Sequence, residues 1–98
     1  MGLFGPSMSE KIRRKAATAF PQANWEMAVD WSTGSKLHKL HGSLSENNTE
    51  AQNMQFARDV WTAICAEYRL HPDDGRDGLL DVSVASPGRS VQRTGVQG

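Results

Sequence analysis

The stretch TEAQNMQFARDVWTAICAEY, residues 49–68, carries the strongest secondary-structure signal in the chain. Its apolar residues recur at spacings of three and four, which places them on one face of an α-helix. This stripe comprises Met54, Ala57, Trp61, Ile64, Cys65 and Tyr68, with Val60 at its edge. Thr49 and Gln52 fit a capping box at the N-terminus, and His71 followed by Pro72 ends the pattern. We therefore predict a helix over about residues 48–70.

A second helix is predicted near the N-terminus. Ser7 and Glu10 fit another capping box, and Met8, Ile12 and Ala16 recur at helical spacing after it. Pro21 disfavours helical geometry at the residue before it, so this helix is expected to run from about residue 8 to residue 20.

The segment between these two helices is also interpreted as helical. Residues 21–31 would be apolar on nearly every side of a helix that has Pro21 in its first turn, which is typical of a buried helix. Leu37, Leu40 and Leu44 would share one face of a short segment that pauses at Gly42. The prediction is therefore an all-α fold, either a helical hairpin or a unit of three to four helices.

The length of 98 residues allows one domain. Residues 1–6 are expected to form a flexible arm, residues 7–80 a single helical domain, and residues 81–98 a largely disordered tail. The tail lacks aromatic residues and is rich in Ser, Gly and Gln, so it offers little apolar surface to bury. The alternation of Leu80, Val82 and Val84 leaves open one short strand over residues 80–84.

Composition excludes several classes of protein. Eleven Lys and Arg balance eleven Asp and Glu, which argues against a histone-like polycation and against an acidic tail. No run approaches the roughly 18 apolar residues of a membrane helix. The single cysteine excludes an intramolecular disulfide scaffold and fits a reducing compartment. We expect a cytoplasmic protein that does not associate with a membrane.

Residues that carry chemistry are few. The possible soft or imidazole metal ligands are His38, His41, Cys65 and His71, but no pair of cysteines has zinc-site spacing, and Cys65 belongs to the apolar stripe. The chain contains no Walker loop, dinucleotide fingerprint or nucleophile elbow. We therefore expect no catalytic residues, no metal site, no cofactor and no enzymatic activity.

Three tryptophans in so small a chain favour an interaction surface, because tryptophan is enriched among the residues that dominate binding energy. The sequence predicts a small, non-enzymatic interaction or regulatory protein that acts as a homodimer through apolar helix faces or binds another protein. The candidate interface residues are Trp25, Trp31, Met54, Trp61 and Tyr68.

The alternative hypothesis is nucleic-acid binding. Lys11, Arg14 and Lys15 would project together from the first helix, and Lys36 and Lys39 would extend the patch if the segment that carries them folds beside it. Clustered cations of this kind contact phosphates in RNA or DNA.

Overall fold

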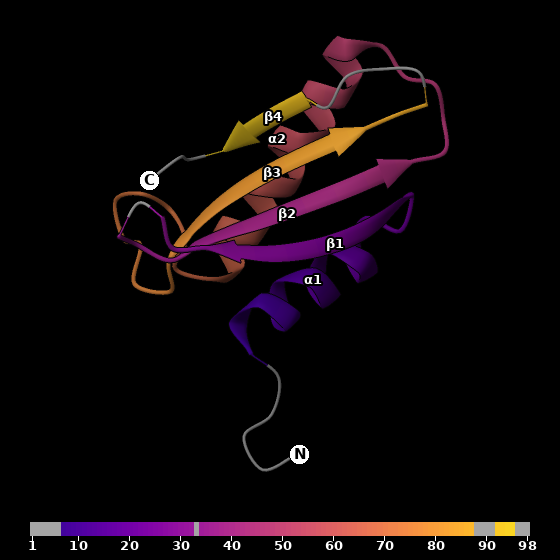
Figure 1. The fold of residues 1–98 in the computed structure, drawn as a ribbon. Coiled ribbons are helices and arrows are strands. Elements are labelled where there is room, and N and C mark those ends of the chain that lie inside the picture. The colour runs from indigo at the N-terminus through magenta and orange to yellow at the C-terminus, as the bar shows by residue number, and fades with distance from the viewer. Residues whose placement is uncertain (1–6, 33, 88–91, 96–98) are drawn as a thin grey trace.

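The computed structural model describes residues 7–32, 34–87 and 92–95. The elements follow one another as α1 (Met8–Ala19), β1 (Ala23–Asp30), β2 (Leu37–Leu44), α2 (Glu50–Glu67), β3 (Leu79–Ala85) and β4 (Gln92–Gly95). The four strands form one sheet in the order β1-β2-β3-β4 (Figure 1). β1 pairs antiparallel with β2, β3 pairs antiparallel with β4, and β2 runs parallel to β3. The parallel pair needs a crossover connection, and α2 lies within it.

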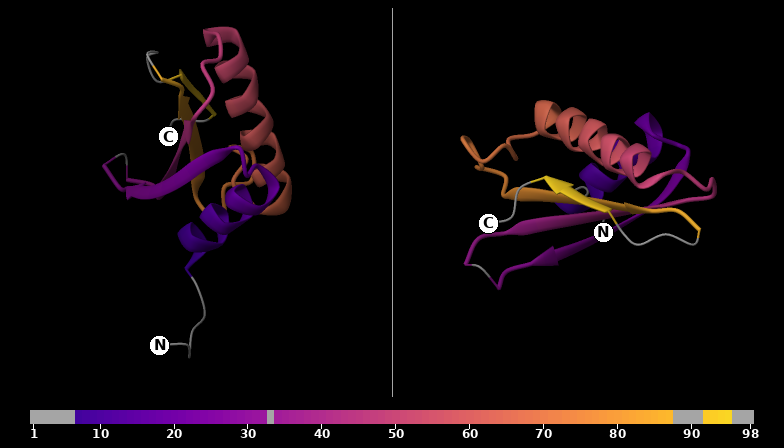
Figure 2. Two further views of the ribbon diagram at one scale, coloured as in Figure 1. Left: turned by 90° about the vertical axis from the view of Figure 1, so that its right-hand side faces the viewer. Right: turned by 90° about the horizontal axis from the view of Figure 1, so that it is seen from above.

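Both helices cover the same face of this sheet, as the two turned views show (Figure 2). α1 packs against β1, and α2 packs against β3 and β4. The fold is therefore a two-layer arrangement of helices on a mixed sheet. No described helix is long and apolar enough to cross a membrane.

The all-α prediction, and with it the helical bundle, is wrong because residues 23–44 form a β-hairpin. In β1 the residues with odd numbers, which include Trp25 and Met27, face the helices. The residues with even numbers, which include Asn24 and Glu26, face the other side of the sheet. This alternation is the period of two that is typical of a strand. When the same residues are placed on a helix, their apolar side chains are distributed around all of its sides.

The leucine pattern in β2 has a similar explanation. Leu40 and Leu44 face the helices and belong to the core. Leu37 is three residues before Leu40, and because side chains alternate along a strand, it points to the other face of the sheet. The spacing of three and four residues that suggested a helix is thus coincidental.

Both predicted outer helices and the short predicted strand are confirmed, as α1, α2 and β3. Thr49 and Gln52 form the full capping box. At α1 only half of the predicted box forms: the Ser7 hydroxyl accepts from the backbone N–H of Glu10. The Glu10 carboxylate instead accepts hydrogen bonds from Arg13 and Arg14.

The expected disordered tail contributes ordered structure. Residues 81–85 belong to β3, where Val82 and Val84 are fully buried beneath α2, and residues 92–95 form β4. Residues 1–6, expected to form a flexible arm, and residues 88–91 and 96–98 of the tail lie outside the described residues.

The core fills the space between the helices and the sheet. Its members include Ile12 and Ala16 from α1, and Ala57, Val60 and Ile64 from α2. The buried row of α2 also contains Asn53, which the sequence pattern placed off the apolar stripe. Its side-chain amide donates to the Ser86 hydroxyl at 3.0 Å, so this buried polar group is held at the end of β3.

Candidate interaction site

The end of β1 carries the large apolar side chains that the core does not cover. Among the described residues, only Val29 and Trp31 are exposed large hydrophobic residues, with 38% and 62% of their surface accessible. They lie two residues apart, where an edge strand enters the turn to β2. Two such side chains side by side on a surface mark a contact site more often than an isolated one does.

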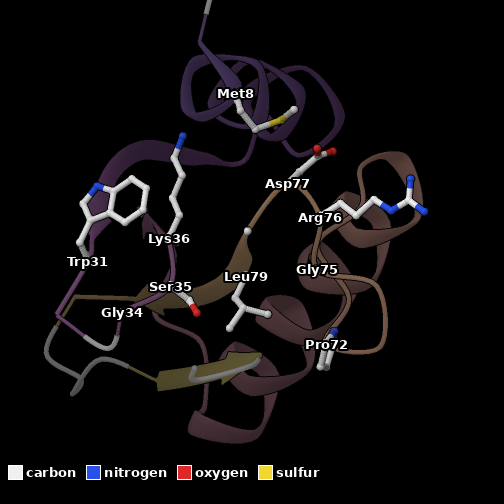
Figure 3. A pocket seen from close by; sticks show the side chains of 11 residues that line it. Met8, Trp31, Gly34, Ser35, Lys36, Pro72, Gly75, Arg76, Asp77 and Leu79 are labelled. Atoms are coloured by element: carbon white, nitrogen blue, oxygen red, sulfur yellow. The ribbon is translucent and has the colours of Figure 1, made fainter.

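Trp31 stands on the rim of a groove with a volume of about 750 Å³. Trp31 and Lys36 project from the turn between β1 and β2, and Arg76 and Asp77 project from the loop between α2 and β3 (Figure 3). Leu79 lies between these two walls, and Met8 from the first turn of α1 lies at one end. The groove thus combines an apolar floor with charged walls, and three separate parts of the chain build it.

His38 holds these parts together from below. Its side chain is fully buried, with Nδ1 3.0 Å from the Ser9 hydroxyl on α1 and Nε2 2.9 Å from the backbone carbonyl oxygen of Asp77. A carbonyl oxygen only accepts, so Nε2 carries the proton and Nδ1 of the neutral ring accepts from Ser9. Burial lowers the pKa of His38, which favours this neutral form.

Gly78 allows the loop wall to approach β2. Its φ of 107° is in the left-handed region, and a Cβ atom there would lie 2.8 Å from the Lys36 carbonyl oxygen. The next residue, Leu79, donates its N–H to that same oxygen at 2.9 Å. The loop is therefore tied to the start of β2, which fixes the wall of the groove that the loop forms.

The structure does not bring the other predicted interface residues to this site. Trp25 is buried in the core, where its Nε1–H donates to the Phe20 carbonyl oxygen. Trp61 and Tyr68 are partly buried against the core, and the Trp61 Nε1–H donates to the Leu80 carbonyl oxygen. Met54 is half-buried on α2. Of the predicted apolar stripe on α2, Ala57 and Ile64 are buried in the core, whereas Met54, Trp61, Cys65 and Tyr68 keep part of their surface exposed.

The five cations of the nucleic-acid hypothesis fall into three places. Lys11, Arg14 and Lys15 line a hollow of about 310 Å³ together with Tyr68, whereas Lys36 lines the groove beside Trp31. Lys39 points to the face of the sheet that carries no helix. Ion pairs engage two of the three helix cations, Arg14 with Glu10 at 3.0 Å and Lys15 with Glu67 at 3.6 Å. These pairs reduce the charge available to phosphates, so nucleic-acid binding is the weaker hypothesis.

The face of the sheet without helices carries a polar row that sequence reasoning did not identify. Glu26, His41 and Ser83 lie directly opposite one another on β1, β2 and β3, and His41 Nδ1 is 2.9 Å from the Ser83 hydroxyl. Strand register alone relates these residues, so only a correct strand prediction could have found them. Glu26 is exposed, whereas His41 and Ser83 are half-buried.

The possible metal ligands are dispersed. His38 lies under the groove, His41 on the other face of the sheet, Cys65 on α2 and His71 in the loop that follows it. Within the described ranges, no three His, Cys, Asp or Glu residues are grouped so as to hold a metal ion. Burial raises the pKa of the Cys65 thiol to about 11, which disfavours the nucleophilic thiolate.

Comparison with known proteins does not add to this description. No protein-family model, no curated protein and no solved structure matches the chain.

Proposed function

We propose that this chain is a small, non-enzymatic interaction protein that self-associates through the Trp31 surface, defined as Val29, Trp31 and the groove beside them. One observation carries the proposal: the most exposed large apolar residue described stands on the rim of a groove of about 750 Å³. Tryptophan anchors of this kind contribute a large share of the binding energy at interfaces. This surface is more exposed than the predicted apolar face of α2, whose Ala57 and Ile64 are buried in the core.

The expected association is weak. One indole buries about 150–250 Å² when it is fully covered, so two of them give well under the 1,200 Å² or more of a stable interface. Neighbouring side chains such as Val29 and Met8 must add contact area. We therefore expect a dimer that forms in the micromolar range and dissociates on dilution.

Sedimentation velocity over a concentration series tests the proposal. The wild-type chain is expected to shift from monomer to dimer, and Trp31→Ser is expected to remain monomeric over the same range. The matched control is Arg58→Ser, which removes a large exposed side chain from α2 and should associate as the wild type does. A wild-type chain that stays monomeric at high micromolar concentration, or a Trp31→Ser dimer of unchanged strength, contradicts the proposal.

A further inference from the structure

We infer that the partner is a second copy of this chain and that the two copies exchange their Trp31 side chains, each indole entering the groove of the other copy. This inference rests on the proposed function and specifies how the Trp31 surface is used. A two-fold dimer needs a patch that is complementary to itself, because the same residues face each other on both subunits. A projecting indole beside a groove that can receive one meets this requirement (Figure 3).

The size and lining of the groove suit an indole. Its volume of about 750 Å³ exceeds that of a single aromatic side chain. Met8, Pro72 and Leu79 supply the apolar lining, and Leu79 lies on the floor between the two walls. Trp31 itself is 62% exposed, so it does not fill the groove of its own chain.

The charges of the two walls are complementary across a two-fold axis. The turn that carries Trp31 also carries Lys36, whereas the loop over residues 71–78 has three aspartates and one arginine, a net charge of −2. If the turn of one copy sits on the loop of the other, each Lys36 lies opposite the acidic loop of the other copy. The two-fold dimer contains this contact twice. Within its own chain, Lys36 has no ion pair with a described residue.

The walls are already positioned for such a contact. His38 joins α1 to the loop, and the Leu79 N–H to Lys36 carbonyl hydrogen bond joins the loop to β2. A rigid receptor of this kind loses little conformational freedom on binding, which favours association. The exchange therefore needs no rearrangement of the core.

Complementation between two defective variants tests the exchange. Trp31→Ser removes the indole and keeps the groove. Ser35→Glu keeps the indole and places a longer, charged side chain at an exposed position in the groove, beside Leu79. Each variant alone should lose at least about tenfold in association, because the central anchor or its receptor is lost from both contacts. In an equimolar mixture at high salt, which screens the new carboxylate from the acidic loop of the other copy, the Ser35→Glu indole enters the Trp31→Ser groove and one of the two contacts is restored.

The expected result is a heterodimer in the mixture, weaker than the wild-type dimer and stronger than either variant alone, detected by sedimentation with one variant labelled. Two outcomes overturn the exchange while the proposed function stands: a mixture that associates no better than its components, and a Ser35→Glu chain that dimerises like the wild type. A wild-type chain that is always monomeric overturns both the exchange and the proposed function.

A second measurement covers the case in which Ser35→Glu does not fold. The fluorescence spectrum of the wild type minus that of Trp31→Ser isolates the emission of Trp31. This emission should shift to shorter wavelength as concentration rises through the dimerisation range, because the indole leaves water. Lys36→Glu should weaken the wild-type dimer, more strongly at low salt than at high salt, whereas Lys39→Glu on the other face of the sheet should not. An emission that stays constant through dimerisation excludes burial of Trp31.

Discussion

Two tryptophans on one strand have opposite environments. Trp25 at the start of β1 is 7% exposed and packs over Gly42 of the neighbouring strand, with its Nε1–H bonded to the Phe20 carbonyl oxygen. Trp31, just after the end of β1, is 62% exposed. The alternation of β1 places Trp25 on the helix side of the sheet, whereas Trp31 lies just beyond the last residue of the strand.

The difference arises from what lies beyond each end of the strand. At the Trp25 end the chain has just left α1, so Phe20 and the helix cover the indole. At the Trp31 end the chain turns towards β2, and the groove lies beside the indole instead of a packed helix. The same residue type therefore contributes to stability at one end of the strand and is available for binding at the other.

Replacement of Trp25 should have the largest effect. Trp25→Ala removes a buried indole and should lower the free energy of unfolding by about 3–5 kcal/mol. Urea denaturation at low protein concentration, where the chain is monomeric, measures this loss. An effect below 1 kcal/mol would show that the Trp25 end of the strand is not part of the core.

Gly42→Ala should have the next largest effect. A Cβ atom at Gly42 would lie 2.5 Å from the Trp25 ring, so the indole must move, at a cost of about 1–3 kcal/mol. Ser43→Ala, at the next position but on the other face of β2, is the control and should be nearly neutral. In a Trp25→Phe background the Gly42→Ala cost should shrink, because the smaller ring leaves room for the methyl group. An unchanged cost would show that the Trp25 ring is not what confines Gly42.

The elements that sequence reasoning predicted are those with local signals. α2 has a complete capping box at Thr49 and a sustained helical period, and neither depends on a distant part of the chain. β3 was visible from the alternation of Leu80, Val82 and Val84. For the hairpin the period of two was present in β1, but it competed with an apolar pattern that fits a helix equally well.

The groove could not have been predicted from local patterns. Met8, Trp31 and Leu79 come from α1, the turn after β1 and β3, and they meet only because β2 and β3 pair in parallel. Trp31 was named as a candidate interface residue from its type, yet nothing in the sequence separated it from Trp25 and Trp61. The difference between Trp31 and the other two tryptophans depends on how other elements cover the ends of β1 and α2, and this is a property of the tertiary structure.

Acid pH should weaken the Trp31 end of the molecule. Burial lowers the pKa of His38 below the ordinary imidazole value of 6.5, whereas the unfolded chain titrates at that value. Above this pH His38 is neutral in both the folded and the unfolded chain, and the free energy of unfolding has its full value. As pH falls below it, the unfolded state binds the proton first, so the free energy of unfolding should decrease until the folded-state pKa of His38 is passed.

Urea denaturation at pH 8 and pH 5.5 measures this decrease. His38→Gln should reduce the pH dependence, whereas the exposed His71→Gln control should retain it because the buried imidazole is still present. A decrease that persists unchanged in His38→Gln would assign it to another group.

Replacement of Trp31 should have the smallest effect on the monomer, and this is the sharpest test of the comparison. Trp31→Ala should change the free energy of unfolding by no more than about 0.5 kcal/mol, because an exposed side chain contributes little to the fold. In dilute solution, acrylamide should quench the Trp31 emission, obtained by subtracting the Trp31→Ala spectrum, far more than the emission of Trp25 and Trp61. A large loss of stability would mean that the indole covers its own groove, and no indole would then remain for a second copy. An unchanged free energy of unfolding together with a loss of dimerisation would show that the two ends of β1 have different roles. The Trp25 end would then support the fold, and the Trp31 end would support association.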